Sequence, residues 1–137
     1  MEAGTTTRLT VATINANCNG VSHQGAIIRD GNVFIVALDG RPVAQAGSLD
    51  SAAHRLAGFL HKALPRQRDE DWGVAVHCLM RPDVALVFGN RGGGGGGGGI
   101  PNPCVGRIIA EYGRGENELE RALEFAARLL ARCCGSS

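Results

Sequence analysis

The stretch QGAIIRDGNVFIVAL, residues 24–38, decides the fold. Two runs rich in apolar and β-branched residues flank Asp30-Gly31-Asn32, and such runs are typical of strands. Asp-Gly at the centre favours a tight hairpin, because the turn that matches the twist of the strands needs positive φ. The stretch therefore predicts two antiparallel strands, over 24–29 and 33–38.

The flanking sequence extends this hairpin into a meander. Residues 9–15 alternate weakly and carry β-branched side chains, which predicts a preceding strand that ends before the turn-forming run at 17–20. A second Asp-Gly pair at 39–40 leads into residues 41–46. Because Pro42 lacks an amide donor, this last strand should be short or lie at a sheet edge.

A helix and a second hairpin follow the meander. Ser48 or Asp50 is a suitable N-cap for a helix that ends at Pro65, and the helix carries one apolar stripe at helical spacing. The stripe consists of Leu49, Ala53, Leu56, Leu60 and Leu64. Residues 72–80 and 84–88 predict the two strands of the second hairpin. Both are largely apolar on both faces, so we expect this hairpin in the middle of the sheet, covered by helices.

The C-terminal third contains a glycine run and helices. Eight consecutive glycines, residues 92–99, have nothing to bury and predict a flexible loop. Residues 105–112 can form a short helix, and 116–134 predict a longer one with acidic residues in its first turns and Arg in its last. The expected fold is α+β: one domain, 1–137, with an antiparallel sheet of about five strands and two main helices packed on it. The order is β-β-β-(β)-α-β-β-(α)-α.

Composition narrows the classes of partner. The chain has 137 residues, and its 14 basic and 13 acidic residues leave a net charge of +1, which gives no strong nucleic-acid signal. No apolar run reaches the ~18 residues of a membrane span. The five cysteines include no C-x-x-C pair, and the first residues do not form a secretory signal, so we expect reduced cysteines and a cytoplasmic location.

No motif with a working catalytic mechanism stands in the sequence. The carboxylates lie mainly at turns and helix starts, where local structure already accounts for them. If the chain is an enzyme, its site must be assembled from distant residues near the glycine loop, for which His23, His77, Arg91 and Cys104 are the candidates. We expect no metal site and no cofactor, so enzymatic activity stays open but is not favoured.

One alternative comes from residues 24–32. This segment, with Asn15-Ala16-Asn17 before it, resembles the second strand of ribonuclease H-like proteins. That family places a metal-binding Asp in the first strand, where this chain has Asn. The resemblance therefore implies an inactive ribonuclease H-like module, because two-metal hydrolysis needs the carboxylate.

A second resemblance concerns residues 34–47 and the helix after them. This strand, turn, strand and capped helix resemble the hairpin-then-helix unit of roadblock and longin-type (profilin-like) domains, and the second hairpin and final helix follow in the order such modules use. The resemblance implies a non-catalytic adaptor or assembly subunit that pairs with itself or a related module in a larger intracellular complex. Its expected partners are proteins.

The C-terminal helix is the surface we expect for such pairing. Its apolar face is wide for a helix that covers one sheet, and the candidate interface residues are Leu123, Phe125, Leu129 and Leu130. The competing interpretation is that this face only covers the sheet.

Overall fold

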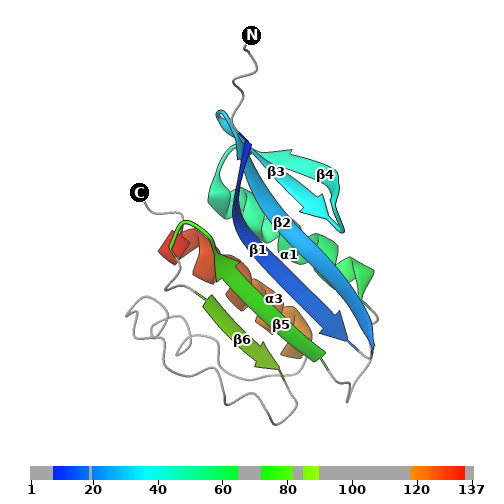
Figure 1. The fold of residues 1–137 in the computed structure, drawn as a ribbon. Helices are drawn as coiled ribbons and strands as arrows, with labels where there is room; N and C mark the ends of the chain where they lie inside the picture. Colours follow the sequence, from blue (N-terminus) through cyan, green and yellow to red (C-terminus); the bar gives the residue numbers. More distant parts are fainter. Residues whose placement is uncertain (1–7, 19, 65–71, 82–84, 90–117, 135–137) are drawn as a thin grey trace.

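The computed structural model describes residues 8–18, 20–64, 72–81, 85–89 and 118–134. These residues form one six-stranded antiparallel sheet with the strand order β4-β3-β2-β1-β5-β6 (Figure 1). The strands are β1 (Arg8–Cys18), β2 (Val21–Asp30), β3 (Val33–Leu38), β4 (Arg41–Ala46), β5 (Trp72–Cys78) and β6 (Ala85–Gly89). The predicted meander is therefore present as β1 to β4, and its first strand, β1, also pairs with β5 of the second hairpin.

Two helices pack side by side against one face of the sheet (Figure 1). Helix α1 (Leu49–Ala63) contacts β1 to β4, and α3 (Glu118–Leu129) contacts β5 and continues into a π-helical turn, η2 (Leu130–Cys134). The α+β class and the order of elements are confirmed. The glycine loop over 92–99 and the helix expected over 105–112 lie outside the described residues.

The second hairpin does not lie in the middle of the sheet. Strand β6 pairs only with β5 and forms one edge, and the described helices cover one face of the sheet rather than both. The expectation was wrong because hydropathy alone does not tell a face covered by helices from one built of small side chains, such as Ala75 and Ala85.

The two Asp-Gly segments form turns of different kinds. In the first, Asp30 pairs with Val33 and Gly31 has a φ of 64°, the positive φ at the first loop position that a type II′ turn has. In the second, Leu38 pairs with Arg41, and both Asp39 (φ 53°) and Gly40 (φ 84°) are left-handed, as in a type I′ turn. Two-residue loops thus fix the register of β2, β3 and β4.

The core lies between the sheet and the two helices. Ile14, Ile27 and Val36 from the central strands are fully buried against Leu56 and Leu60 of α1. Gly25 makes the closest approach of α1 to the sheet possible, because a Cβ at this position would lie 2.5 Å from Leu56 Cδ1 and 3.0 Å from the Ile14 carbonyl oxygen. A side chain here would push the helix away.

Local signals fix both ends of α1. The Ser48 hydroxyl oxygen accepts a hydrogen bond from the Ser51 amide (3.1 Å), so Ser48 rather than Asp50 is the N-cap. At the other end, the Leu64 amide donates to the Leu60 carbonyl oxygen (3.1 Å), and Leu64 itself is extended. The helix therefore stops directly before Pro65, as the sequence predicts.

Edge strand β4 is poorly suited to accept another strand. Pro42 has no amide hydrogen, and the register between β3 and β4 shifts at Val43, which leaves that residue bulged and 40% exposed. Proline and bulges on an edge both interrupt the row of backbone groups that strand addition needs. The edge position predicted for this strand from Pro42 is present.

The cysteines depart from the expectation of fully reduced thiols. Cys18, at the end of β1, is a buried thiol, whereas Cys78, at the end of β5, is disulfide-bonded. None of the described helices combines the length and the apolar stretch that crossing a bilayer requires.

Candidate interaction surface

The face of the sheet opposite the helices is the most extensive surface that the fold leaves without a covering helix among the described elements. We call it the open face. In an antiparallel sheet, directly paired residues share a face, so the strand registers assign its members. They are Arg8, Thr10, Thr13, Asn15, Asn17, Ser22, Gln24, Ala26, Ile28, Asp30, Val33, Ile35, Ala37, Pro42, Gln45, Gly73, Ala75, His77 and Ala85.

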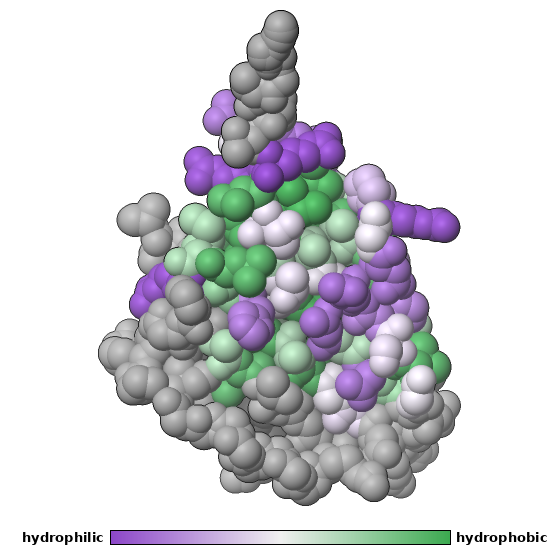
Figure 2. Space-filling model, viewed as in Figure 1, coloured by the Kyte–Doolittle hydropathy of each residue, from purple (hydrophilic) through white to green (hydrophobic). Residues whose placement is uncertain are grey.

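The open face has a polar half and an apolar half along the strand direction. Figure 2 views this face, with hydrophilic side chains along the lower right and in a band at the top, and hydrophobic ones in the upper half below that band. The polar half lies at the end of β1 and the start of β2, where Asn15, Asn17 and Gln24 are exposed. The apolar half contains Ile28 and Ile35, which pair across β2 and β3; Ile28 is half-buried and Ile35 is buried.

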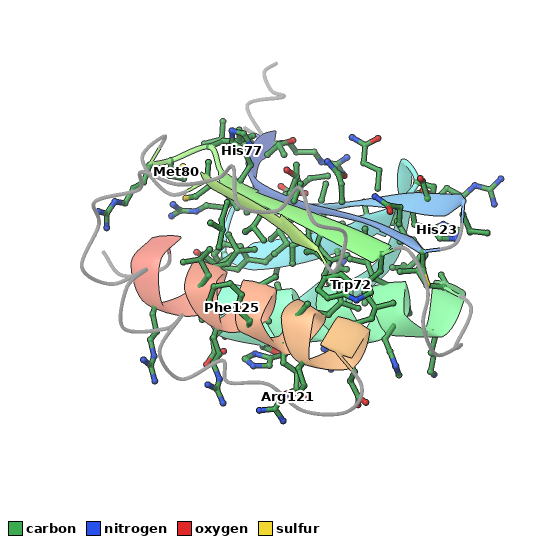
Figure 3. All side chains as sticks on the ribbon, turned by 90° about the horizontal axis from the view of Figure 1, so that it is seen from below. His23, Trp72, His77, Met80, Arg121 and Phe125 are labelled. Atoms are coloured by element: carbon green, nitrogen blue, oxygen red, sulfur yellow. The ribbon has the colours of Figure 1, made fainter. Side chains whose placement is uncertain are left out.

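One end of the apolar half is extended by two large side chains. Leu79 and Met80 follow β5 directly and are 51% and 48% exposed. The Leu79 amide donates to the Val11 carbonyl oxygen (2.9 Å), which holds this segment beside β1, and Met80 lies at the same end of the sheet as His77 (Figure 3). The exposed apolar surface therefore continues past the end of the strand.

Charge distinguishes the open face from the helical side of the molecule. On the open face the described charged side chains are Arg8 and Asp30, which pair with each other at one end of the sheet (Nε to Oδ2, 3.1 Å). The outward surface of the helices carries exposed charges from both helices, and Arg121 points away from the sheet (Figure 3). These exposed residues are Asp50, Arg55, Lys62, Arg121, Glu124 and Arg128. The helical side thus presents solvated charges, whereas the open face is nearly uncharged.

An amide packs over a glycine within the polar half. A Cβ on Gly73 would lie 3.2 Å from Asn17 Nδ2, so the Asn17 side chain leans across β5 at this position. Gly25 and Gly73 therefore make room on opposite faces of the sheet, Gly25 for a helix and Gly73 for an amide.

The side chains of His23 and Asp39 form a hydrogen-bonded pair on the helical side of the sheet. Residue His23 pairs with Ala16, whose side chain is in the core, so it projects to the helical side. Its Nδ1 lies 2.7 Å from Asp39 Oδ2, while the Gln24 amide donates to Asp39 Oδ1 (2.9 Å). The Asp39 amide donates back to the Gln24 carbonyl oxygen (2.7 Å). These contacts fasten the β3–β4 turn to β2.

The hydrogen bonds change the acidity of the carboxyl group. The backbone amide of Gln24 and then the hydrogen bond with His23 lower the pKa of Asp39 below its usual value of 3.8. A carboxyl whose pKa is lower in the folded chain stabilises the fold above its unfolded pKa, and this stabilisation is lost as the pH falls through the folded pKa. The turn should therefore loosen in acid.

We expect Asp39→Asn to flatten the acid side of the stability profile. Asparagine keeps a side-chain oxygen for the Gln24 amide and tolerates positive φ, but it does not titrate. Urea unfolding midpoints measured between pH 5 and pH 2.5 should fall less for the variant than for the native chain. Equal slopes for the variant and the native chain would contradict the prediction.

Among the described residues, the two catalytic candidates His23 and His77 do not come together. His77 is exposed on the open face, paired with Thr13 and Ala85, whereas His23 projects to the helical side. Arg91 and Cys104 lie outside the described residues. Ser22 neighbours His23 in β2 and therefore points to the opposite face, so the His23–Asp39 pair has no serine from its own strand to activate. Within the described ranges, no three His, Cys, Asp or Glu side chains cluster as metal ligands.

The four candidate interface residues of the C-terminal helix are in the core. Leu123 and Phe125 are 1% and 4% exposed, and Leu129 and Leu130 are fully buried. In this structure they pack in the hydrophobic core beside α1 and β5, which is the competing interpretation weighed for this helix. The apolar face of α3 is wide because it contacts a neighbouring helix as well as the sheet.

Comparison with known proteins adds no assignment. No protein family model matches the sequence, and neither curated proteins nor solved structures give a significant match. The resemblances to roadblock and longin-type domains and to ribonuclease H-like proteins therefore stay predictions.

Proposed function

We propose that the chain is a non-catalytic adaptor or assembly subunit that pairs with a copy of itself or with a related module and supports a larger complex. The observation that carries this proposal is the contrast between the two sides of the molecule. The central part of a protein interface is depleted in charged residues, and the open face fits this description while the helical side does not.

The exposed apolar residues support the same function. Leu79 and Met80 are about half exposed at the margin of a face on which Ile28 is half-buried and Ile35 is buried, at 8% exposure. Monomeric soluble proteins rarely expose large contiguous apolar patches. Such patches, when polar groups surround them, mark sites of protein association. The polar half of the open face supplies that rim on one side.

The alternative of a small enzyme has less support from the geometry. It required His23 and His77 to converge, and the register places them on opposite faces of the sheet. The cytoplasmic location also stays a prediction. The buried Cys18 thiol fits a reducing compartment and the Cys78 disulfide an oxidising one, and a thiol count on protein from its native source would test the location.

The size of the protein in an extract of its native source tests the proposed function. A subunit of a complex elutes from a size-exclusion column well ahead of a single chain. The purified chain should reach twice its monomer mass in sedimentation equilibrium if it pairs with itself. It should remain a monomer if its partner is a related module. An extract in which the protein elutes as a single chain, together with a purified protein that stays monomeric at high concentration, would contradict the proposal.

A further inference from the structure

We propose that a second copy of the chain docks on the open face, sheet against sheet, with the polar half of one copy on the polar half of the other. This inference rests on the proposed function and specifies its surface and its partner. The result is a sandwich of two six-stranded sheets with helices on both outer sides, a packing in which the strands of the two sheets cross at about 30°.

The first argument concerns charge. In a two-fold symmetric contact each residue near the axis lies close to its own copy, so a charged face repels itself. The open face avoids this penalty, because the described charges on it, Arg8 and Asp30, already neutralise each other at one end. A strongly acidic or basic partner would instead place its charges against uncharged side chains and lose their hydration without compensation.

The second argument concerns hydrogen bonding. Asn15, Asn17 and Gln24 are exposed in the polar half, and an amide side chain both donates and accepts. An amide can therefore bond to an identical amide across a two-fold axis, which neither a carboxylate nor an ammonium group can do with its own kind. The chemistry of the polar half is complementary to itself.

The division into two halves fixes the direction of the symmetry axis. The halves follow one another along the strands, so an axis parallel to the strands places amides on amides and aliphatic groups on aliphatic groups. An axis across the strands would place the amides of one copy on Ile28 and Ile35 of the other. Since β1 and β2 are the two central strands, the axis runs between them and Asn15 faces Gln24 of the second copy.

The size of the face is close to that of a standard protein interface. Six strands spaced about 4.8 Å apart and about 20 Å long give a projected area of roughly 500 Å², and the side chains roughen it to a larger accessible area. Specific protein contacts bury roughly 800 Å² on each partner. The open face therefore approaches the standard size when most of it is covered.

Other surfaces of the described chain are less suited to self-pairing. The helical side presents Arg121, Glu124 and Arg128 to solvent, and burying them would cost hydration. The β4 edge carries Pro42 and the bulge at Val43, which oppose the addition of a strand. The open face has neither of these two obstacles.

Two oppositely charged variants test the contact. Asn15→Asp with Gln24→Asp places four carboxylates around the proposed axis, and Asn15→Arg with Gln24→Arg places four guanidinium groups there. Each variant alone should have a dimer dissociation constant at least about tenfold higher than the native chain, because like charges face one another. An equimolar mixture should regain a dissociation constant within about threefold of the native one, because opposite charges then meet.

Control variants carry one added charge of the same sign on the helical side. Ser51→Asp and Ser51→Arg, at an exposed position of α1, should leave the dissociation constant unchanged. A photoreactive benzophenone side chain placed at Gln24 should cross-link two native-fold chains, and the same group at Ser51 should not. This second measurement does not depend on how well the charged variants fold.

The outcomes separate this inference from the proposed function. A native dimer that neither charged pair weakens, and that Gln24 does not cross-link, overturns the open-face contact while self-pairing stands. A purified chain that remains monomeric overturns the contact between copies, and the protein's size in its native extract then decides the adaptor function independently. Weakened variants rescued by mixing support the contact.

Discussion

Leu56→Ala is expected to lower the free energy of unfolding by about 2–5 kcal/mol, the usual cost of removing a buried leucine side chain and leaving a cavity. Leu56 is fully buried and packs directly over Gly25 of β2. Neighbouring strands cannot move in to fill the space, because their backbone is held in the sheet. Urea unfolding followed by circular dichroism at one fixed protein concentration measures the loss.

Leu9→Ala is the matched control for this variant. Leu9 lies near the start of β1 and is 47% exposed, so its truncation should change stability by only about 0.5 kcal/mol or less. A Leu56→Ala variant whose stability falls no more than that of Leu9→Ala would contradict the placement of α1 against the sheet.

Gly25→Ala is expected to destabilise the fold by about 1–3 kcal/mol, although replacing glycine in a strand usually helps. The new Cβ would lie 2.5 Å from Leu56 Cδ1 and 3.0 Å from the Ile14 carbonyl oxygen. Leu56 sits in a packed core and Ile14 contributes backbone, so neither can yield cheaply. The overpacking therefore exceeds the entropic gain. Urea unfolding measures this change in the same way.

The two variants should interact, and their combination gives the sharper test. In a chain that already carries Leu56→Ala, the methyl group of Gly25→Ala enters the cavity, so it should cost far less than in the native chain or restore some stability. Gly47→Ala is the control, because a Cβ there meets nothing within 4 Å. Additive effects of Gly25→Ala and Leu56→Ala would show that the two residues do not touch.

Local sequence signals were sufficient for most of the fold. Asp30-Gly31 and Asp39-Gly40 mark the turns that set the meander, and Ser48 and Pro65 bracket α1. These are short-range effects, decided by the φ of one residue or by one capping hydrogen bond. They survive in the structure because no distant contact opposes them.

The arrangement of the layers could not be obtained in this way. The second hairpin is apolar on both faces, yet β6 is an edge strand, and the helices cover one face of the sheet. Alanine is small enough to remain on a face that no helix covers. Ala75 and Ala85 therefore do not indicate whether a helix packs on their side of the sheet. Likewise, the width of the apolar face of α3 could not show that α1 and the sheet both contact it.

The contacts of Asp39 with Gln24 and His23 could have been predicted from the sequence. A two-residue loop at 31–32 pairs Asp30 with Val33, and counting backwards along the hairpin brings Asp39 beside Gln24. The contact of Asp39 with His23 then follows from one further residue along β2. The Asp-Gly turn is by itself a sufficient reason for an aspartate at position 39, so its residue type does not reveal the contact with His23.

The bulge and proline of β4 have a consequence for how the protein behaves at high concentration. A cross-β fibre grows because each added chain offers a fresh strand edge on its far side. Here the far side of every chain would be β4, where Pro42 cannot donate and Val43 is out of line. Each added molecule would therefore expose an edge that does not accept a further strand. Amyloid-like polymers of the native fold should not propagate.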